Sequence, residues 1–151
     1  MQISARIDYA VRALVELAVA ADGQRTRQEL AEAQQIPPRY LEAVLVDLRR
    51  AGLVVGQRGK SGGYTLGRPA GEISVADIAR AVDGPLTLVQ GQRPETVSYA
   101  GSSQHVHELW IGLRAALRAV MESVTLDTLV RGDLPDDVRA MVDDPDAWLP
   151  R

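Results

Sequence analysis

Residues 37–66, PPRYLEAVLVDLRRAGLVVGQRGKSGGYTL, hold the pattern that decides the fold. A helical segment ends near Gly52, an apolar strand follows, and a basic, glycine-rich turn leads into a second strand. The turn carries Arg58 and Lys60, and no acidic residue occurs between positions 54 and 68. Such a hairpin suits a polyanion, because attraction to phosphate supplies most of the sequence-independent affinity for nucleic acid. This order predicts the recognition helix and wing of a winged helix-turn-helix DNA-binding domain.

The segments before this stretch complete the winged unit. Helical spacing of apolar residues predicts a first helix over 4–22, with Ser4 as its N-cap. Thr26 and Glu29 form a capping-box pattern that opens a second helix, which runs to about residue 34. The third helix starts at Pro37 or Pro38 and ends at residue 51. Its expected buried side consists of Tyr40, Leu41, Val44, Leu45 and Leu48.

The rest of the chain divides by composition and periodicity. Ser74 caps a short fourth helix over 75–82, which completes a winged domain over 1–85. Residues 86–104 lack a clear period and are expected to form a flexible loop. A helix follows within 105–131, and 132–151 is an acidic, Pro-containing tail that we expect to be frayed or loosely docked. The predicted fold class is therefore mainly α with a small β-hairpin wing and a long C-terminal dimerisation helix.

The long helix has a wide apolar face. Its apolar residues alternate spacings of four and three, as in a heptad seam. Packing against its own domain accounts for part of this face, and we expect a homodimer to bury the rest. A two-fold dimer would bind a palindromic site with half-sites roughly 34 Å apart. The candidate interface residues are Val106, Trp110, Leu113, Leu117, Val120 and Val124.

Composition and charge limit the function classes. The chain has 151 residues, 46% of them apolar, without a run that would span a membrane or a signal-peptide pattern, so a cytoplasmic protein is expected. The net charge is −3, but residues 1–68 carry ten Lys and Arg against seven Asp and Glu, whereas 69–151 carry seven against thirteen. The positive field therefore lies in the half that holds the wing.

Taken together, several segments resemble the Rrf2 (Rrf-two) family of bacterial winged-helix regulators, which includes IscR-, NsrR- and CymR-like proteins. The resemblance covers about residues 1–131. It implies a dimeric transcription factor, often a repressor, whose third helix enters the major groove while the wing reaches the minor groove. The matching segments are SARIDYAVRALVEL (4–17), IPPRYL (36–41), LRRAGLV (48–54), RGKSGGYTL (58–66) and ISVADIARAV (73–82).

The resemblance and the chemistry together suggest which residues bind double-stranded DNA. Arginine can bind guanine bidentately, and Glu42 could accept a hydrogen bond from cytosine N4. The start of the second helix could donate to phosphate. Packing of Tyr40 in the core and a solvated role for Glu42 remain open alternatives. The candidates are Thr26, Arg27, Gln28, Pro38, Arg39, Tyr40, Glu42, Arg58, Gly59, Lys60, Ser61, Gly62 and Gly63.

Many members of the family sense through an iron-sulfur cluster held by three cysteines in the loop before the long helix. This chain has no cysteine, and the corresponding loop offers Ser98, Ser102 and Ser103 instead. Serine hydroxyls are poor substitutes for thiolate on iron, so we expect no cluster and no other cofactor. Whether a serine replaces a native cysteine is not fixed by the sequence. His105 and His107 fall on different helix faces, and we expect no metal site there.

Sensing could instead use a small ligand or a protein partner, or regulation could follow abundance alone. Tyr9, Arg12, Tyr99 and Trp110 are candidates for lining a ligand pocket, because aromatic faces and a cation can hold a planar or anionic molecule. The more probable alternative is structural. Trp110 would then anchor the dimer, Tyr9 would pack on its own domain, and Arg12 would pair with Asp8.

The leading hypothesis is a sequence-specific DNA-binding regulator, and the rival is a winged protein-interaction module. An enzyme is not expected, because no catalytic triad or pair of catalytic carboxylates is evident. The turn at 59–63 leads into a strand rather than a helix, unlike a nucleotide-binding loop. The operator, the target genes, the signal and the choice between activation and repression do not follow from the sequence.

Overall fold

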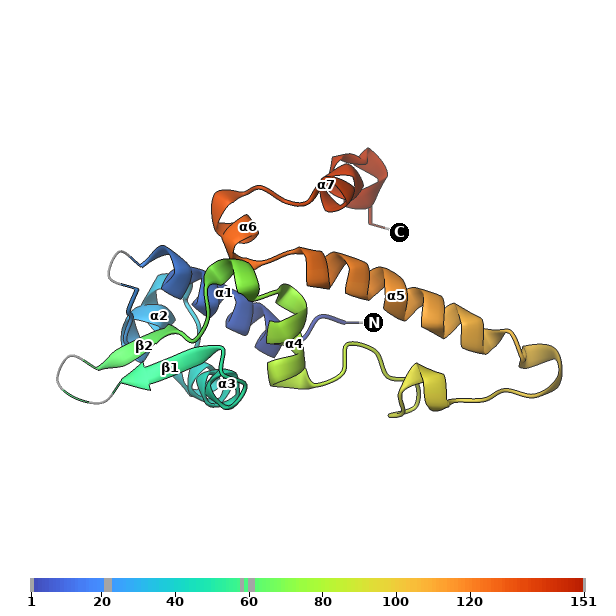
Figure 1. The fold of residues 1–151 in the computed structure, drawn as a ribbon, viewed down its shortest axis with the longest axis horizontal. Coiled ribbons are helices and arrows are strands. Elements are labelled where there is room, and N and C mark those ends of the chain that lie inside the picture. The colour runs from blue at the N-terminus through green and yellow to red at the C-terminus, as the bar shows by residue number, and fades with distance from the viewer. Residues whose placement is uncertain (1, 21–22, 58, 60–61, 151) are drawn as a thin grey trace.

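The computed structural model describes residues 2–20, 23–57, 59 and 62–150, and it places a helical winged domain at one end of an elongated molecule (Figure 1). The helices and strands are α1 (Ala5–Val19), α2 (Arg27–Gln34), α3 (Pro38–Arg50), β1 (Val54–Gln57), β2 (Gly63–Leu66), α4 (Val75–Asp83), α5 (Val106–Ser123), α6 (Leu126–Arg131) and α7 (Asp136–Asp143). Short 3-10 helices lie at Ala70–Glu72, Pro94–Thr96, Gly101–Ser103 and Pro145–Trp148.

Side-chain caps set the starts of three helices in the winged domain, as the sequence predicts. Ser4 accepts a hydrogen bond from the backbone N–H of Ile7 at 3.2 Å. Thr26 and Glu29 form a reciprocal capping box at α2, and Ser74 does the same for α4. Each cap satisfies backbone donors that the helix leaves free, a contribution of about 1 kcal/mol. The first helix ends at Val19, earlier than the predicted residue 22.

The core of the winged domain lies where α1, α3 and α4 meet. Its largest fully buried side chains are Leu14, Leu17, Leu30, Ile36, Leu41, Val44, Leu45, Leu48, Leu53, Ile73, Ile78 and Leu126. Tyr40 is a correction, because it is 48% exposed rather than buried with its neighbours on α3. Leu41, Val44 and Leu48 already form the inward stripe at helical spacing, so Tyr40 falls beside it. Its ring instead lies 6.3 Å from the ring of Tyr9.

The wing is the predicted antiparallel hairpin, with Val54 opposite Leu66 and Gln57 opposite Gly63. A further backbone pairing ties it to the segment before α2. The N–H of Arg25 donates to the carbonyl of Tyr64 at 3.0 Å, and the N–H of Tyr64 donates back at 2.7 Å. The wing is therefore held on both sides of β2, by β1 and by the approach to the second helix.

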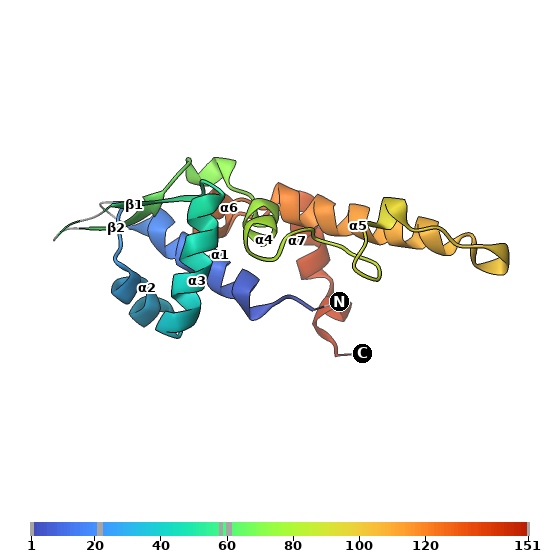
Figure 2. The same ribbon diagram turned by 90° about the horizontal axis from the view of Figure 1, so that it is seen from below.

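Residues 86–104 run away from the winged domain to the far end of the molecule, and helix α5 returns beside them (Figures 1 and 2). A small apolar cluster of Ala76, Ala79 and Met121 joins α5 to α4. Val124, predicted as a dimer contact, is only 6% exposed because it packs at the end of α5 inside its own chain. That residue is corrected to a core position, while Leu113 on the same helix is 38% exposed.

Regular structure continues past α5, beyond what the sequence predicts. Within 105–131, where the sequence predicts one long helix, α5 ends at Ser123 and Thr125 caps a separate helix, α6. The acidic tail contains α7, which begins after Pro135 with Asp136 and Asp137 in its first turn and buries Val138. Acidic residues there favour a helix start, because they complement the positive end of the helix dipole. No helix in the described part of the chain is long and apolar enough to cross a membrane.

Candidate nucleic-acid interface

A concave surface of about 360 Å³ lies between the start of α2, the end of α3 and the wing. Its walls are polar and basic, and its wing side is formed mostly by glycine backbone. It brings together five of the predicted DNA-binding residues from two parts of the chain. The lining residues are Thr26, Arg27, Arg49, Gly56, Gln57, Gly59, Gly62, Gly63 and Tyr64. We call this surface the wing cleft.

Helices α2 and α3 are tied together at the edge of the wing cleft. Arg27 forms an ion pair with Glu42 at 2.9 Å, and both side chains are well exposed. The carboxylate of Glu42 therefore holds the guanidinium of Arg27 and also offsets part of its charge. Gln28 and Pro38 lie around an adjoining hollow with Arg27. Glu42 is thus neither a core residue nor a free carboxylate.

The start of α3 presents an exposed cation and an aromatic ring. The guanidinium of Arg39 lies 5.1 Å from the centre of the Tyr40 ring. Tyr40 in turn contacts Tyr9 on α1, and the guanidinium of Arg12 lies 5.5 Å from the centre of the Tyr9 ring. Stacking of this kind restricts the arginine side chain, so Arg39 is held at the surface where a helix entering a groove would present it.

Arg49 is a candidate interface residue that the sequence interpretation does not include. It lies at the end of α3, is exposed and lines the wing cleft together with Arg27. Its spacing of seven residues from Glu42 could have identified it, because residues seven apart on a helix share a face. The neighbouring Arg50 lies one step further around the helix and pairs with Asp47 at 3.3 Å.

The wing glycines also have a structural role. Gly63 lines the wing cleft, and most of its surface is buried against neighbouring backbone. A Cβ at Gly62 would lie 2.6 Å from the carbonyl oxygen of Gln57, across the turn. Gly59 has φ of +119°, a conformation that favours glycine. The predicted contacts Arg58, Lys60 and Ser61 lie outside the described residues.

Replacing Gly63 by alanine is expected to loosen the wing. The new Cβ would lie 2.8 Å from the carbonyl oxygen of Arg25, so the pairing between Arg25 and Tyr64 must open. We expect a loss of about 1–3 kcal/mol in the free energy of unfolding, measured by urea denaturation. Gly56→Ala, on the opposite strand, is the control, because its Cβ would meet only the Tyr64 ring at 3.6 Å. Equal losses in the two variants would contradict this account.

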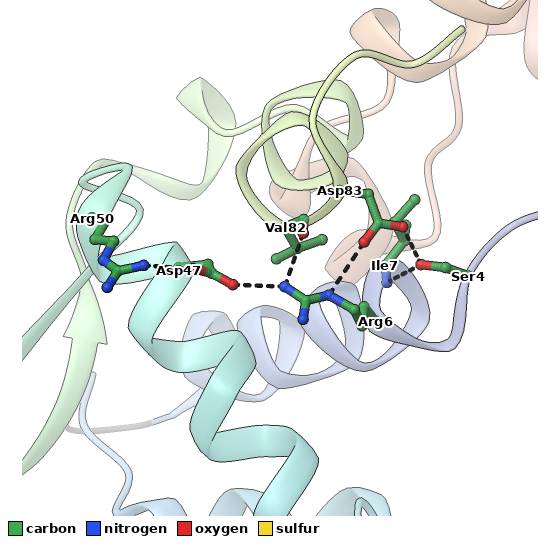
Figure 3. Close-up of polar contacts among 7 residues, drawn as sticks. All are labelled: Ser4, Arg6, Ile7, Asp47, Arg50, Val82 and Asp83. Carbon is green, nitrogen blue, oxygen red and sulfur yellow. Dashed lines mark hydrogen bonds and ion pairs between the residues drawn. The ribbon is translucent and has the colours of Figure 1, made fainter. Parts of the chain in front are cut away.

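Arg6 fixes the position of the recognition helix α3 against α1 and α4 (Figure 3). Its Nη2 donates to Asp47 of α3 at 2.6 Å and to the carbonyl of Val82 at 2.9 Å. Its Nε lies 3.2 Å from Oδ1 of Asp83, and the other carboxylate oxygen of Asp83 accepts a hydrogen bond from Ser4. Three helices thus meet at one guanidinium, because its planar fork can serve several acceptors at once.

The four predicted ligand-pocket residues do not come together. Tyr9 and Arg12 form one pair on α1, where Arg12 also pairs with Asp8 at 2.9 Å. Tyr99 and Trp110 form another, in which the indole N–H donates to the tyrosine hydroxyl at 3.1 Å. Helix α1 and the start of α5 lie apart in both views (Figures 1 and 2). Tyr9 and Arg12 therefore match the structural alternative, and the four residues form no shared pocket.

The fold and this surface define a winged helix-turn-helix DNA-binding protein. The sequence pattern of the Rrf2 family, described as iron-dependent transcriptional regulators, matches residues 3–132. The chain belongs to this family. It is therefore a DNA-binding transcriptional regulator, not an enzyme.

Individual relatives agree with this assignment. A Mycobacterium tuberculosis protein named as a candidate HTH-type transcriptional regulator is 43% identical over 145 residues, covering 95% of this chain and 90% of its own. The structure of CymR of Bacillus subtilis, described as its global cysteine regulator, is 32% identical with a TM-score of 0.73, covering 87% of this chain and 98% of CymR. The IscR structure from T. potens is 27% identical with a TM-score of 0.67, covering 100% and 93%.

The residues of this chain do not fit a thiolate-bound iron site, although the family description includes iron. The chain has no cysteine, and the loop before α5 has the hydroxyls of Ser98, Ser102 and Ser103 in place of thiols. Within the described residues, no group of three His, Cys, Asp or Glu side chains could hold a metal ion. His105 lies beside the exposed Glu108 at 3.4 Å. We derive no step of the function through iron.

Proposed function

We propose that the chain acts in the cytoplasm as a homodimer that binds a palindromic operator and represses transcription. The observation that carries this proposal is the wing cleft, in which the start of α2, the end of α3 and the wing line one basic surface. A recognition helix in the major groove would place Arg27 and Arg49 beside phosphates. Occupancy of a promoter by such a dimer excludes other proteins from the same DNA, which is the simplest route to repression.

The proposed dimer uses the outer face of α5. Leu109 is 60% exposed, and Leu113, one turn further on, is 38% exposed. Gly112 and Ala116 lie on the same face of the helix and are exposed as well. An apolar stripe on a projecting helix favours burial against a second copy, since a two-fold axis pairs identical faces. The predicted seam residues Val106, Trp110, Leu117 and Val120 are half-buried at the border of this stripe.

Selection of binding sites from random duplex DNA tests the proposal. We expect an inverted repeat and an affinity that falls steeply between two salt concentrations, because each phosphate contact releases counterions. Sedimentation of the same preparation should give the mass of a dimer. A protein that selects no sequence and binds no duplex would favour a protein-interaction module instead.

A second test uses the two basic residues that the sequence places in the turn of the wing. The double variant Arg58→Glu with Lys60→Glu reverses both basic charges at the tip of the hairpin. We expect its operator affinity to fall at least about tenfold at low salt, as attraction turns to repulsion. Unchanged affinity, measured by fluorescence anisotropy on a selected site, would contradict the assignment of the wing.

A further inference from the structure

A second cleft, of about 450 Å³, lies between α4, the segment that follows it and α5. Its volume suits a small metabolite rather than a macromolecule. The three walls come from segments that belong to the winged domain, the connecting loop and the projecting helix. The lining residues are Arg80, Gly84, Pro85, Leu86, Thr87, Arg93, Glu95, Arg114 and Arg118. We call this site the arginine cleft.

The ion pairs in the arginine cleft leave an excess of positive charge. Glu122 pairs with both Arg80 and Arg118, the latter at 3.0 Å. Glu95 pairs with Arg114. Three of the four lining arginines therefore share two carboxylates, and Arg93 is the fourth. Asp77 lies further off, 4.0 Å from Arg80 and 3.8 Å from Arg68.

Both carboxylates stay ionised near neutral pH. Hydrogen bonds from Arg80 and then Arg118 hold the pKa of Glu122 below its usual value. A hydrogen bond from its own backbone, followed by one from Arg114, does the same for the pKa of Glu95. The two acids are already engaged, so they do not cancel the remaining cations.

Two further lining groups add to the binding capacity of the arginine cleft. Among the described residues Arg93 has no ion pair, and its side chain is exposed at the rim. The hydroxyl of Thr87 is buried in the wall and has no hydrogen-bond partner there. A ligand that hydrogen-bonds to this hydroxyl would satisfy a buried polar group that is otherwise costly. Pro85 and Leu86 supply apolar surface beside these donors.

We propose that the arginine cleft binds a small organic dianion, a phosphate ester or a dicarboxylate, as the effector of this regulator. Guanidinium groups match the geometry of both anions, because their planar forks donate two parallel hydrogen bonds to carboxylate or phosphate oxygens. A dianion restores the charge balance that the two glutamates leave incomplete. Binding by itself does not depend on the proposed function, whereas the role as effector rests on it.

A continuous set of contacts links the arginine cleft to the recognition helix. Arg80 and Gly84 line the cleft from the last turn of α4 and the residue after it. Between them, the carbonyl of Val82 and the carboxylate of Asp83 hold Arg6, which also holds Asp47 of α3 (Figure 3). A ligand that draws α5 and α4 together shifts these acceptors and so changes how α3 is presented to DNA.

Calorimetric titration with two probes, glycerol 3-phosphate and succinate, tests the binding site. We expect one probe to bind with one equivalent per chain, and its identity distinguishes the phosphate from the dicarboxylate class. The double variant Arg93→Gln with Arg118→Gln should weaken that binding by roughly tenfold or more. The control Arg131→Gln should not, although Arg131 also pairs with an acid four residues away, Asp127. Failure of both probes to bind, or equal binding by the double variant, would overturn the proposal.

The effector role is tested on a selected operator with and without the bound probe. We expect the probe to change operator affinity by at least about threefold, and Arg6→Met to abolish the change while the probe still binds. A probe that binds without changing operator affinity, or a change that survives in Arg6→Met, would overturn the link through Arg6. A chain that binds the probe but no DNA would instead contradict the proposed function and leave the binding site standing.

Discussion

Arg49→Glu is expected to weaken operator binding by roughly 30-fold or more at about 0.1 M salt. Arg49 is exposed at the end of the recognition helix and faces the wing across the wing cleft. A dimer presents it twice, so the substitution removes two phosphate contacts and places two carboxylates against the backbone. The slope of the affinity against salt should also become shallower, by about 2 on a double logarithmic plot.

Arg50→Glu is the matched control for this prediction. The two arginines are neighbours, and the change in charge is identical. Arg50 points to Asp47 and does not line the wing cleft, so its replacement should leave operator affinity within a few-fold of the wild type. Thermal unfolding of both variants checks that the fold is retained. Equal losses of affinity in the two variants would show that net charge, and not the place of Arg49, sets the binding.

The winged domain was predictable because its signals are local. Ser4, Thr26 and Ser74 each cap the next helix by accepting a hydrogen bond from the backbone N–H three residues further on. The glycine turn separates two short apolar strands. Caps and turns act through hydrogen bonds between near neighbours in the chain, so a sequence carries them directly. The same local character explains why the order of these elements indicated the correct fold class.

The incorrect predictions concern residues whose burial depends on packing between segments that are distant in the sequence. Tyr40 has the apolar character of a core residue, but the inward stripe of α3 was already complete without it. Val124 continues the heptad spacing of α5, yet it is buried where α5 turns back to α4. Helical periodicity shows that a face is apolar and does not show which partner covers it.

Only part of the candidate site was predictable from the sequence, because the rest depends on packing between distant segments. Thr26 and Arg27 were assigned from the start of α2, and the wing from its basic turn, and these segments do line one cleft. Gly63 lines this cleft too, and its missing side chain also makes room for the backbone of Arg25, a role that the sequence does not indicate. Arg49 and the arginine cleft depend on how α3, α4 and α5 are arranged, which the spacing of residues in the sequence does not specify.

Leu113→Glu is expected to convert the proposed dimer into monomers. The side chain lies on the exposed stripe of α5, so a charge there faces solvent in a single chain and should leave its fold intact. In a two-fold dimer the same substitution buries two carboxylates, often close to each other, at a cost of several kcal/mol. We expect the dissociation constant of the dimer to rise roughly 100-fold or more, measured by analytical ultracentrifugation.

Ala115→Glu provides the control on the same helix. Ala115 is exposed but lies about 160° around the helix from Leu113, so its replacement adds the same charge outside the stripe. A monomeric Leu113→Glu variant should still bind a half-site weakly and lose the cooperative binding to the full palindrome, because each subunit keeps its own wing cleft. If Leu113→Glu remains dimeric, the subunits must associate through another surface, and the proposed role of the α5 stripe would be wrong. If both variants dissociate, the interface must extend around α5 to include Ala115.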